Sequence, residues 1–311
     1  MNSVENRNLQ PLDLHGLASV ISMERIAWDE PMSKHTSFNI GGPADALVTP
    51  ANEEELADLL KFCRLANQPY CIIGRGTNLL VRDKGIRGVV IKIDQPLSNI
   101  KIEGSHVTAG AGIALGELSR QTGQRGLSGL EFAVGIPGSL GGAVLMNAGA
   151  YDGEMKDVIK RVRVIDENGE FKVFTLDQIK YGYRYSIFQG SKMVVLEATV
   201  QLIDDDPVAI KSRIDDFTQR REARQPLDLP SAGSVFRRPD GYYVGPMLQE
   251  LGFKGFRVND AQVSEVHAGF IVNRGQARAA DVLELIAIIQ EKVKNQYKVD
   301  LLPEIKIIGE D

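Results

Sequence analysis

The sequence has few cysteines, no long apolar run and no metal-ligand pattern. Its 311 residues include only two cysteines, Cys63 and Cys71, and their separation is too large for a CxxC motif. This excludes a disulfide framework and a thiolate metal site, and it is typical of a reducing compartment. Apolar stretches are interrupted by glycine or charge well before about 18 residues, so no membrane span is expected. The four histidines show no ligand spacing, and no metal is predicted.

Positive charge is also not in excess. The chain carries 36 Lys and Arg against 41 Asp and Glu, a net charge of −5. This excludes the basic surface by which proteins bind nucleic acid or anionic membranes. The first thirty residues begin with polar side chains and lack the apolar core of a signal peptide. We therefore expect a cytoplasmic protein, a monomer or weak oligomer, with two or three domains at this length.

Glycine, in contrast, is abundant, with 31 residues. The average for globular proteins is about 7%. The excess has no collagen-like period, and it suggests backbone that lies close against other groups, a ligand being one candidate.

The first ninety residues alternate between helix and strand patterns. Apolar spacing predicts a helix over 14–27 that ends before Pro31, and a second helix that begins at Asn52. Buried strands are predicted at 70–73 and 89–93.

From about residue 98 short strands dominate. A helix near 114–122 is predicted to end at Gly123, and alternation on both sides of residues 166–169 predicts a β-hairpin. Residues 193–203 read as a buried strand.

The acidic run at 204–206, followed by Pro207, is the best domain boundary. An amphipathic helix with a basic end follows, and residues 282–297 give a strong helical stripe before a last short strand at 305–308.

Two glycine-rich loops are the first candidates for chemistry. One, residues 74–78, follows a predicted strand directly, and the other spans residues 135–142. Closely spaced glycines let backbone N–H groups converge on phosphate oxygens. Neither loop is a G-x-G-x-x-G or Walker A motif, because Leu79 stands at the third glycine position and no Lys-Ser/Thr pair follows. Each loop alone is equally well explained as a tight turn, but together they favour a diphosphate ligand.

Three polar residues have an ordinary structural explanation when each is considered by itself. Ser234 can be a turn former, Arg184 a guanidinium stacked on a neighbouring tyrosine, and Glu304 a solvated carboxylate at a strand end. A serine hydrolase is a poor interpretation, because Ser234 does not lie in a G-x-S-x-G elbow and no histidine is near it in sequence.

Several motifs considered together resemble the UDP-N-acetylenolpyruvoylglucosamine reductases, flavoenzymes that make UDP-N-acetylmuramate for peptidoglycan. The resemblance covers most of the chain, from about residue 33 to 308, in the family's order. The matching stretches are 35–45 (HTSFNIGGPAD), 74–81 (GRGTNLLV), 129–139 (GLEFAVGIPGS), 141–151 (GGAVLMNAGAY), 183–184 (YR), 231–236 (SAGSVF), 262–264 with 267–273 (QVS and HAGFIVN), and 303–304 (PE).

The resemblance implies an α+β fold: a vanillyl-alcohol-oxidase-type FAD-binding domain of two α/β subdomains and a C-terminal α/β substrate-binding domain. The boundaries it suggests are an N-terminal extension at 1–32, the FAD-binding domain at 33–205 (subdomains about 33–96 and 97–205), and the substrate-binding domain at 206–311. FAD would be held non-covalently, with NADPH as hydride donor. The absence of an extra tyrosine-bearing loop suggests the type II branch. The implied cofactor-binding residues are Gly74, Arg75, Gly76, Thr77, Asn78, Gly135, Pro137, Gly138, Ser139, Gly141, Gly142 and Asn147.

The resemblance also implies the catalytic residues. Ser234 matches the donor of a proton to C2 of the substrate, Arg184 the arginine that binds the substrate carboxylate, and Glu304 its acidic partner. The implied substrate is UDP-N-acetylglucosamine enolpyruvate, with no nucleic-acid or membrane partner. Its implied contacts are Tyr151, Tyr183, Arg224 and Arg238, although Arg224 can equally be a solvated member of the basic patch Arg220, Arg221 and Arg224.

The chain departs from the family pattern at several positions. Asp152 stands where glycine is common, Pro246 where lysine is frequent, residues 258–260 (VND) replace a frequent Ile-Gly-Gly, and Arg238 replaces an asparagine of some members. None of these removes a catalytic residue. Two alternatives stay open, an FAD-dependent sugar or alcohol oxidase on the same domain and a non-catalytic flavin- or nucleotide-binding sensor.

Overall fold

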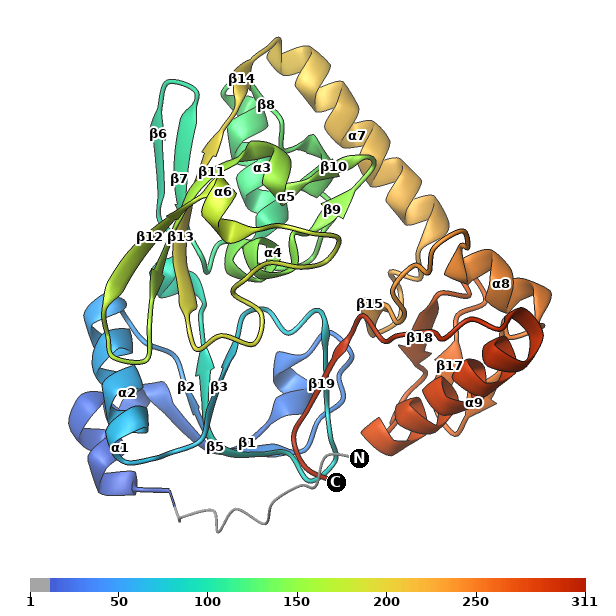
Figure 1. Ribbon diagram of the computed structural model, residues 1–311, viewed down its shortest axis with the longest axis horizontal. Helices are drawn as coiled ribbons and strands as arrows, with labels where there is room; N and C mark the ends of the chain where they lie inside the picture. Colours follow the sequence, from blue (N-terminus) through green and yellow to red (C-terminus); the bar gives the residue numbers. More distant parts are fainter. Residues whose placement is uncertain (1–11) are drawn as a thin grey trace.

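The computed structural model describes residues 12–311, which form three regions (Figure 1). We call them the first region (residues 12–97), the second region (98–224) and the C-terminal region (225–311). Residues 1–11, part of the predicted N-terminal extension at 1–32, lie outside the described residues.

The first region is a four-stranded sheet with one long helix on it. The strand order is β1-β2-β5-β3, with β2, β5 and β3 parallel and β1 antiparallel to β2. Asn52 caps α2 by accepting a hydrogen bond from the Glu55 N–H at 2.8 Å, as predicted. The elements are α1 (Leu14–Val20), β1 (Ile26–Pro31), β2 (Pro43–Val48), α2 (Glu53–Leu65), β3 (Tyr70–Ile73), β4 (Leu79–Val81) and β5 (Ile86–Lys92), with 3-10 turns η1 (Met23–Arg25), η2 (Met32–His35) and η3 (Gln95–Leu97).

The predicted helix over 14–27 was wrong in its second half. Helix α1 ends at Val20, and residues 26–31 form β1 at the edge of the sheet, paired with β2 from Ile26↔Val48 to Pro31↔Pro43. Pairing with a strand far along the chain overrides the local helical spacing here. The described part of the predicted extension is therefore built into the first region.

The second region is a five-stranded antiparallel sheet in the order β12-β11-β13-β7-β6, covered by α4 (Figure 1). The predicted hairpin is β11 and β12, and the predicted buried strand is β13. The elements are β6 (Ile100–Glu103), β7 (His106–Gly110), α3 (Leu115–Gln124), β8 (Leu127–Ser128), η4 (Glu131–Ala133), α4 (Leu140–Met146), β9 (Gly149–Ala150), β10 (Gly153–Glu154), α5 (Met155–Val158), β11 (Ile159–Ile165), β12 (Phe171–Thr175), α6 (Leu176–Ile179), β13 (Val194–Gln201), β14 (Ile203–Asp204) and α7 (Pro207–Arg224).

Gly123 does not end helix α3, contrary to the prediction. The helix continues to Gln124, and Gly126, with φ +74°, reverses the chain. A Cβ on Gly123 would lie 2.9 Å from Cγ2 of Ile210, so this glycine lets α3 and α7 approach each other.

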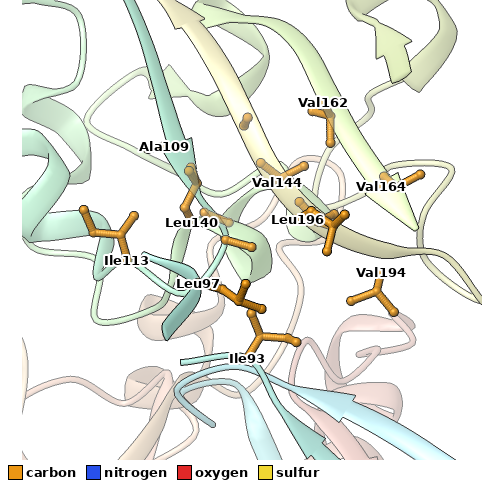
Figure 2. Close-up of a cluster of buried hydrophobic side chains, with 14 of the residues drawn as sticks. Ile93, Leu97, Ala109, Ile113, Leu140, Val144, Val162, Val164, Val194 and Leu196 are labelled. Carbon is orange, nitrogen blue, oxygen red and sulfur yellow. The ribbon is translucent and has the colours of Figure 1, made fainter. Parts of the chain in front are cut away.

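One hydrophobic core joins the first and second regions. Figure 2 shows part of it, where Leu140 and Val144 of α4 pack between Ala109 and Leu196 of the second sheet, with Ile93 at the edge of the first region. Helix α7 packs along α3 and η4, so it belongs structurally to the second region and carries the chain to the C-terminal region.

The C-terminal region is a four-stranded sheet, β15-β18-β17-β16, packed on helices α8 and α9. The last strand of the chain, β19, is not part of this sheet. It pairs in parallel with β4 of the first region, from Lys306↔Leu79 to Ile308↔Val81. The elements are β15 (Ser231–Ser234), α8 (Val244–Glu250), β16 (Arg257–Val258), β17 (Ala261–Val263), β18 (Phe270–Asn273), α9 (Ala279–Tyr297) and β19 (Lys306–Ile308).

Candidate active site

The two glycine loops lie against each other. A Cβ on Gly74 would lie 2.4 Å from Ser139 Oγ, and one on Gly138 would lie 3.5 Å from Thr77 Oγ1. Gly76 has φ +65°, and a Cβ there would be 1.9 Å from the carbonyl oxygen of His35. Glycine is thus required at 76, where a Cβ would collide with backbone, and at 74 a Cβ would displace the Ser139 hydroxyl.

A cavity of about 560 Å³ opens beside these loops. It lies between the glycine loops, helix α7 and the connection from α7 to β15. Its size is within the range of small-molecule and cofactor sites. The lining residues include Thr77, Gly135 and Pro137 from the loops, Arg120 from α3, Thr218 and Arg221 from α7, residues 226–231, Gly233 and Phe270.

Arg221 gives this cavity positive charge. Burial lowers the pKa of its guanidinium, but an arginine stays protonated in proteins. Its side chain lies over Gly135, where a Cβ would meet Arg221 Cδ at 2.6 Å. A half-buried cation without an ion-pair partner among residues 12–311 favours an anionic ligand.

Arg184 and Glu304 meet although 120 residues separate them. Arg184 Nε donates to Glu304 Oε1 at 2.9 Å, and Nη2 donates to the carbonyl oxygen of Gly149 at 3.2 Å. The side chains of Arg184 and Glu304 are 22% and 16% exposed, so water screens their interaction only partly. The guanidinium also lies over the Tyr183 ring, 5.0 Å from its centroid.

Ser234 lies close to the backbone of Glu304. The Glu304 N–H donates to the carbonyl oxygen of Val235 at 2.7 Å, which places the backbone of Glu304 beside the end of β15. Ser234 Oγ is half-buried and makes one long hydrogen bond, at 3.3 Å, to the carbonyl oxygen of Phe236. Gly233, the preceding residue, lines the cavity. The fold therefore joins Arg184 to Glu304 by an ion pair and brings the backbone of Glu304 beside the strand end that carries Ser234. Of the three residues, only Ser234 adjoins a residue that lines the cavity, Gly233.

The side chains of two predicted cofactor-binding residues donate hydrogen bonds to other groups of the protein. Asn147 is fully buried, and its side chain donates to Glu154 Oε2 at 2.7 Å and to the Gly182 carbonyl at 3.1 Å. Asn78 Nδ2 donates to the carbonyl oxygen of Glu304 at 3.2 Å, and so ties its loop to the last strand. Arg75 is exposed, and Gly141 and Gly142 begin α4.

The four predicted substrate-binding residues do not line the cavity. Tyr151 stacks on Phe217 of α7 with ring centroids 4.4 Å apart, and its hydroxyl donates to the Phe217 carbonyl at 3.1 Å. Tyr183 is 53% exposed beside Arg184. Arg238 is exposed and lies 3.9 Å from the Tyr243 ring centroid, and Arg224 is exposed at the end of α7.

The departures at Asp152 and Asn259 have a structural consequence. Their φ angles are +64° and +49°, in the left-handed region. Glycine adopts this region most easily, and Asp and Asn are the side chains that tolerate it best. These two departures therefore keep the backbone conformation that a glycine would favour.

Sequence reasoning missed the roles of two residues near the site, Arg221 and Lys306. Arg221 was noted only as part of a basic patch, yet it is the member of that patch that lines the cavity. Lys306 Nζ donates to Gln189 Oε1 at 3.2 Å beside Arg184, and burial, with the nearby Arg237, lowers the pKa of Lys306. The one signal for Lys306 in the sequence was its position, two residues after the predicted catalytic residue Glu304.

Among residues 12–311 no group of three or more His, Cys, Asp or Glu side chains could hold a metal ion. Within the same residues no helix is long and apolar enough to cross a membrane.

Comparison with known proteins identifies similar chains along the whole length. A family model described as the C-terminal domain of UDP-N-acetylenolpyruvoylglucosamine reductase matches residues 225–308, and an FAD binding domain model matches residues 44–175. A curated reductase of this name from Clostridium perfringens (strain 13 / Type A) is 52% identical over 295 residues, covering 95% of this chain and 97% of the relative. One from Clostridium botulinum is 47% identical over 311 residues, covering 100% and 99%.

A solved structure agrees. The crystal structure of UDP-N-acetylenolpyruvylglucosamine reductase from Thermus caldophilus has a TM-score of 0.78 and 36% sequence identity, and the match covers 89% of this chain and 97% of that one. The similarity therefore includes all three regions.

Proposed function

The chain belongs to the UDP-N-acetylenolpyruvoylglucosamine reductase family, and we propose that it reduces the enolpyruvyl ether of UDP-N-acetylglucosamine enolpyruvate with NADPH. It is an FAD-dependent oxidoreductase of UDP-N-acetylmuramate synthesis, as the sequence motifs predicted. The predicted fold is also confirmed: α+β, with a vanillyl-alcohol-oxidase-type FAD-binding domain of two α/β subdomains and a C-terminal α/β domain.

We propose that FAD binds along the two glycine loops. Thr77, Gly135 and Pro137 of these loops line the cavity, and Arg221 packs on Gly135 in the space that a Cβ would occupy. We assign the loops 74–78 and 135–142 to the pyrophosphate, held non-covalently by backbone N–H groups and the hydroxyls of Thr77 and Ser139. When bound, FAD supplies the hydride-transfer chemistry that connects NADPH to the substrate.

Arg184 would bind the carboxylate of the enolpyruvyl group. Glu304 accepts from Nε and the Gly149 carbonyl accepts from Nη2, and we assign the remaining Nη1 donors to the substrate carboxylate. Hydride addition at C3 of the enolpyruvyl group places negative charge at C2, shared with the carboxylate. A permanently charged guanidinium held by an ion pair stabilises that charge without reorganising.

Ser234 would then protonate C2, which completes the lactyl ether. A hydroxyl is a weak acid, but C2 at that stage is a strong base, and a positioned neutral donor suffices. Its long hydrogen bond to Phe236 costs little to break. Glu304 acts by orienting Arg184. The observation that carries this proposal is the ion pair of Arg184 and Glu304, with the backbone of Glu304 bonded to Val235 next to Ser234.

The UDP part of the substrate would lie toward α7 and the exposed residues of the C-terminal region. We keep Arg224, Arg238, Tyr151 and Tyr183 as proposed contacts and add Arg221, because it lines the cavity. We propose that the substrate-binding domain begins at the end of α7, near residue 225, since α7 packs on the second region. The type II branch, a cytoplasmic location and a monomeric or weakly oligomeric state complete the proposal.

The test is an anaerobic titration of the holoenzyme. NADPH should bleach the flavin absorbance, and UDP-N-acetylglucosamine enolpyruvate should restore it without oxygen. NADH at the same concentration tests the preference for NADPH.

Recovery of the absorbance only when air is admitted would favour a sugar or alcohol oxidase. Bleaching by neither nicotinamide, in protein reconstituted with FAD, would favour the non-catalytic sensor. Either result would overturn the proposal.

A further inference from the structure

Arg184 adopts a backbone conformation that its side chain does not favour. Its φ is +52°, in the left-handed region. It lies in a two-residue turn closed on both sides, because Gly182 N donates to the Tyr185 carbonyl at 3.0 Å and Tyr185 N donates to the Gly182 carbonyl at 3.2 Å. Glycine or asparagine is usual at such a position. An arginine there is held against its preference by its surroundings, and such outliers cluster at functional sites.

Gln189 supplies much of that support. Its Nε2 donates to the carbonyl oxygen of Arg184 itself at 2.8 Å and to that of Leu145, in α4, at 3.0 Å. Its Oε1 accepts from Lys306 Nζ at 3.2 Å. These partners fix which end of the amide faces which way, since the reverse orientation would point an oxygen at two carbonyls and an NH2 at an ammonium.

Two further contacts hold the same turn to the C-terminal end of α4. Asn147 donates to the Gly182 carbonyl, and Ser186 Oγ donates to the Leu145 carbonyl at 2.8 Å. The N-terminal end of α4 begins at Ser139, in the second glycine loop. One helix thus connects the loop assigned to the cofactor with the turn that carries Arg184.

We propose that Gln189 is a positioning residue for Arg184: its amide holds the Arg184 carbonyl, and with it the left-handed turn that aims the guanidinium at Glu304 and the substrate carboxylate. The proposal rests on the proposed function only for the identity of the ligand, the substrate carboxylate. The role of Gln189 in holding the turn does not depend on that function. Gln189 itself contacts neither glycine loop in the described residues, and it acts through Arg184.

The Gln189→Glu variant removes both donors with little change of shape, and it leaves the acceptor for Lys306. Anaerobic reoxidation by UDP-N-acetylglucosamine enolpyruvate should fall between about 10-fold and 100-fold, the effect of a misplaced catalytic group. Bleaching by NADPH should stay within about twofold, since hydride transfer from NADPH involves no carboxylate held by Arg184. The dissociation constant of UDP-N-acetylmuramate, measured from its perturbation of the oxidised flavin spectrum, should rise. Gln249→Glu, at an exposed position of α8, is the matched control and should change none of these.

A double-mutant cycle separates positioning from a general structural role. Arg184→Lys removes the guanidinium, so adding Gln189→Glu to it should slow reoxidation by less than about threefold more. The proposal would be overturned if the two substitutions slowed reoxidation independently, so that the double variant showed the product of the single effects. It would also be overturned if Gln189→Glu were reoxidised within twofold of the wild-type rate.

A crystal structure of the Gln189→Glu holoenzyme tests the geometry without activity. Arg184 should leave the left-handed region, or its Nε should separate from Glu304 Oε1. An unchanged Arg184 would overturn the inference. If wild type itself is not reoxidised by the enolpyruvyl substrate, the proposed function fails, while this crystallographic result still decides the role of Gln189.

Discussion

The C-terminal region meets the other two regions in different ways. Against the first region the contact is apolar and continuous: Phe38, Ile40 and Leu80 of the first region are buried in the core of the C-terminal region. Against the second region the observed contacts are between polar side chains, Arg184 with Glu304 and Lys306 with Gln189. Residues of all three regions line the cavity.

Hydrogen bonds to backbone carbonyls reinforce the first contact. Ser231 N donates to the Ser37 carbonyl at 3.1 Å, and Asn273 Nδ2 donates to the Phe38 carbonyl at 3.2 Å. Strand β19 pairs with β4. The C-terminal region is therefore anchored on the first region, and Glu304 faces the second region across a polar contact, where we propose that the substrate carboxylate binds. Stability and catalysis should respond to substitutions on different sides.

Phe38→Ala should weaken the apolar contact between the C-terminal region and the first region. Phe38 is fully buried, so its loss leaves a cavity in the core of the C-terminal region and should lower the free energy of unfolding by about 3–5 kcal/mol. Urea denaturation of the holoenzyme measures this. Leu65→Ala, at a residue of α2 that is 74% exposed, is the control and should change little. A loss below about 1 kcal/mol for Phe38→Ala would mean that this contact does not anchor the region.

Ser234→Ala should impair catalysis without affecting stability. Without the hydroxyl, reoxidation by the enolpyruvyl substrate should slow by about 100-fold or more, while bleaching by NADPH and the melting temperature stay near wild type. Rapid-mixing absorbance of the two half-reactions measures this, with Ser212→Ala on the exposed face of α7 as control. Equal slowing of both half-reactions would argue against Ser234 as the proton donor.

Asp83→Ala tests a single polar tie on the anchored side. Asp83, in the loop after β4, accepts from the N–H groups of Ala279 and Ala280 at 2.8 and 3.0 Å, and so caps α9 from another region. Loss of such a cap costs about 1 kcal/mol. The melting temperature should fall while both half-reactions keep their rates. Asp240→Ala, an exposed carboxylate, should leave the melting temperature unchanged.

The elements of this comparison differ in how far the sequence predicts them. Periodicity and turn residues specify α9, β3 and the hairpin of β11 and β12, because their signals are local. Helix α1 was predicted too long because β1 forms by pairing with β2, a contact between distant segments. No periodicity indicates that Phe38 is buried in the C-terminal region or that Gly123 serves the packing of α3 on α7.

The site follows the same division. The motifs identify Ser234, Arg184 and Glu304, but only the fold brings Arg184 and Glu304 within hydrogen-bonding distance. The support for Arg184 comes from an ordinary glutamine, Gln189, whose role depends on the left-handed turn. Arg221 was indistinguishable from its neighbours in the basic patch until helix α7 was placed against Gly135.

The smallest expected effect concerns how α7 is held to the second region, on the side of the cavity. Glu131 is buried there. Burial by itself raises the pKa of its carboxyl, but hydrogen bonds from the N–H groups of Gly129 and of Glu131 itself, and from Arg213 and Ser128, outweigh this and hold the pKa below its ordinary value of 4.5. The unfolded chain therefore binds this proton more readily than the folded protein does. The stabilisation is fully present above about pH 4.5 and is lost as the pH falls through the lower pKa of the folded state.

Glu131→Gln should accordingly reduce stability at pH 7 and flatten the decline of the melting temperature below pH 4.5. Glu117→Gln, at an exposed position of α3, should leave the decline as in wild type. An unchanged slope in Glu131→Gln would show that α7 is held by its apolar contacts alone, and the cavity side would then be as firmly built as the anchored side.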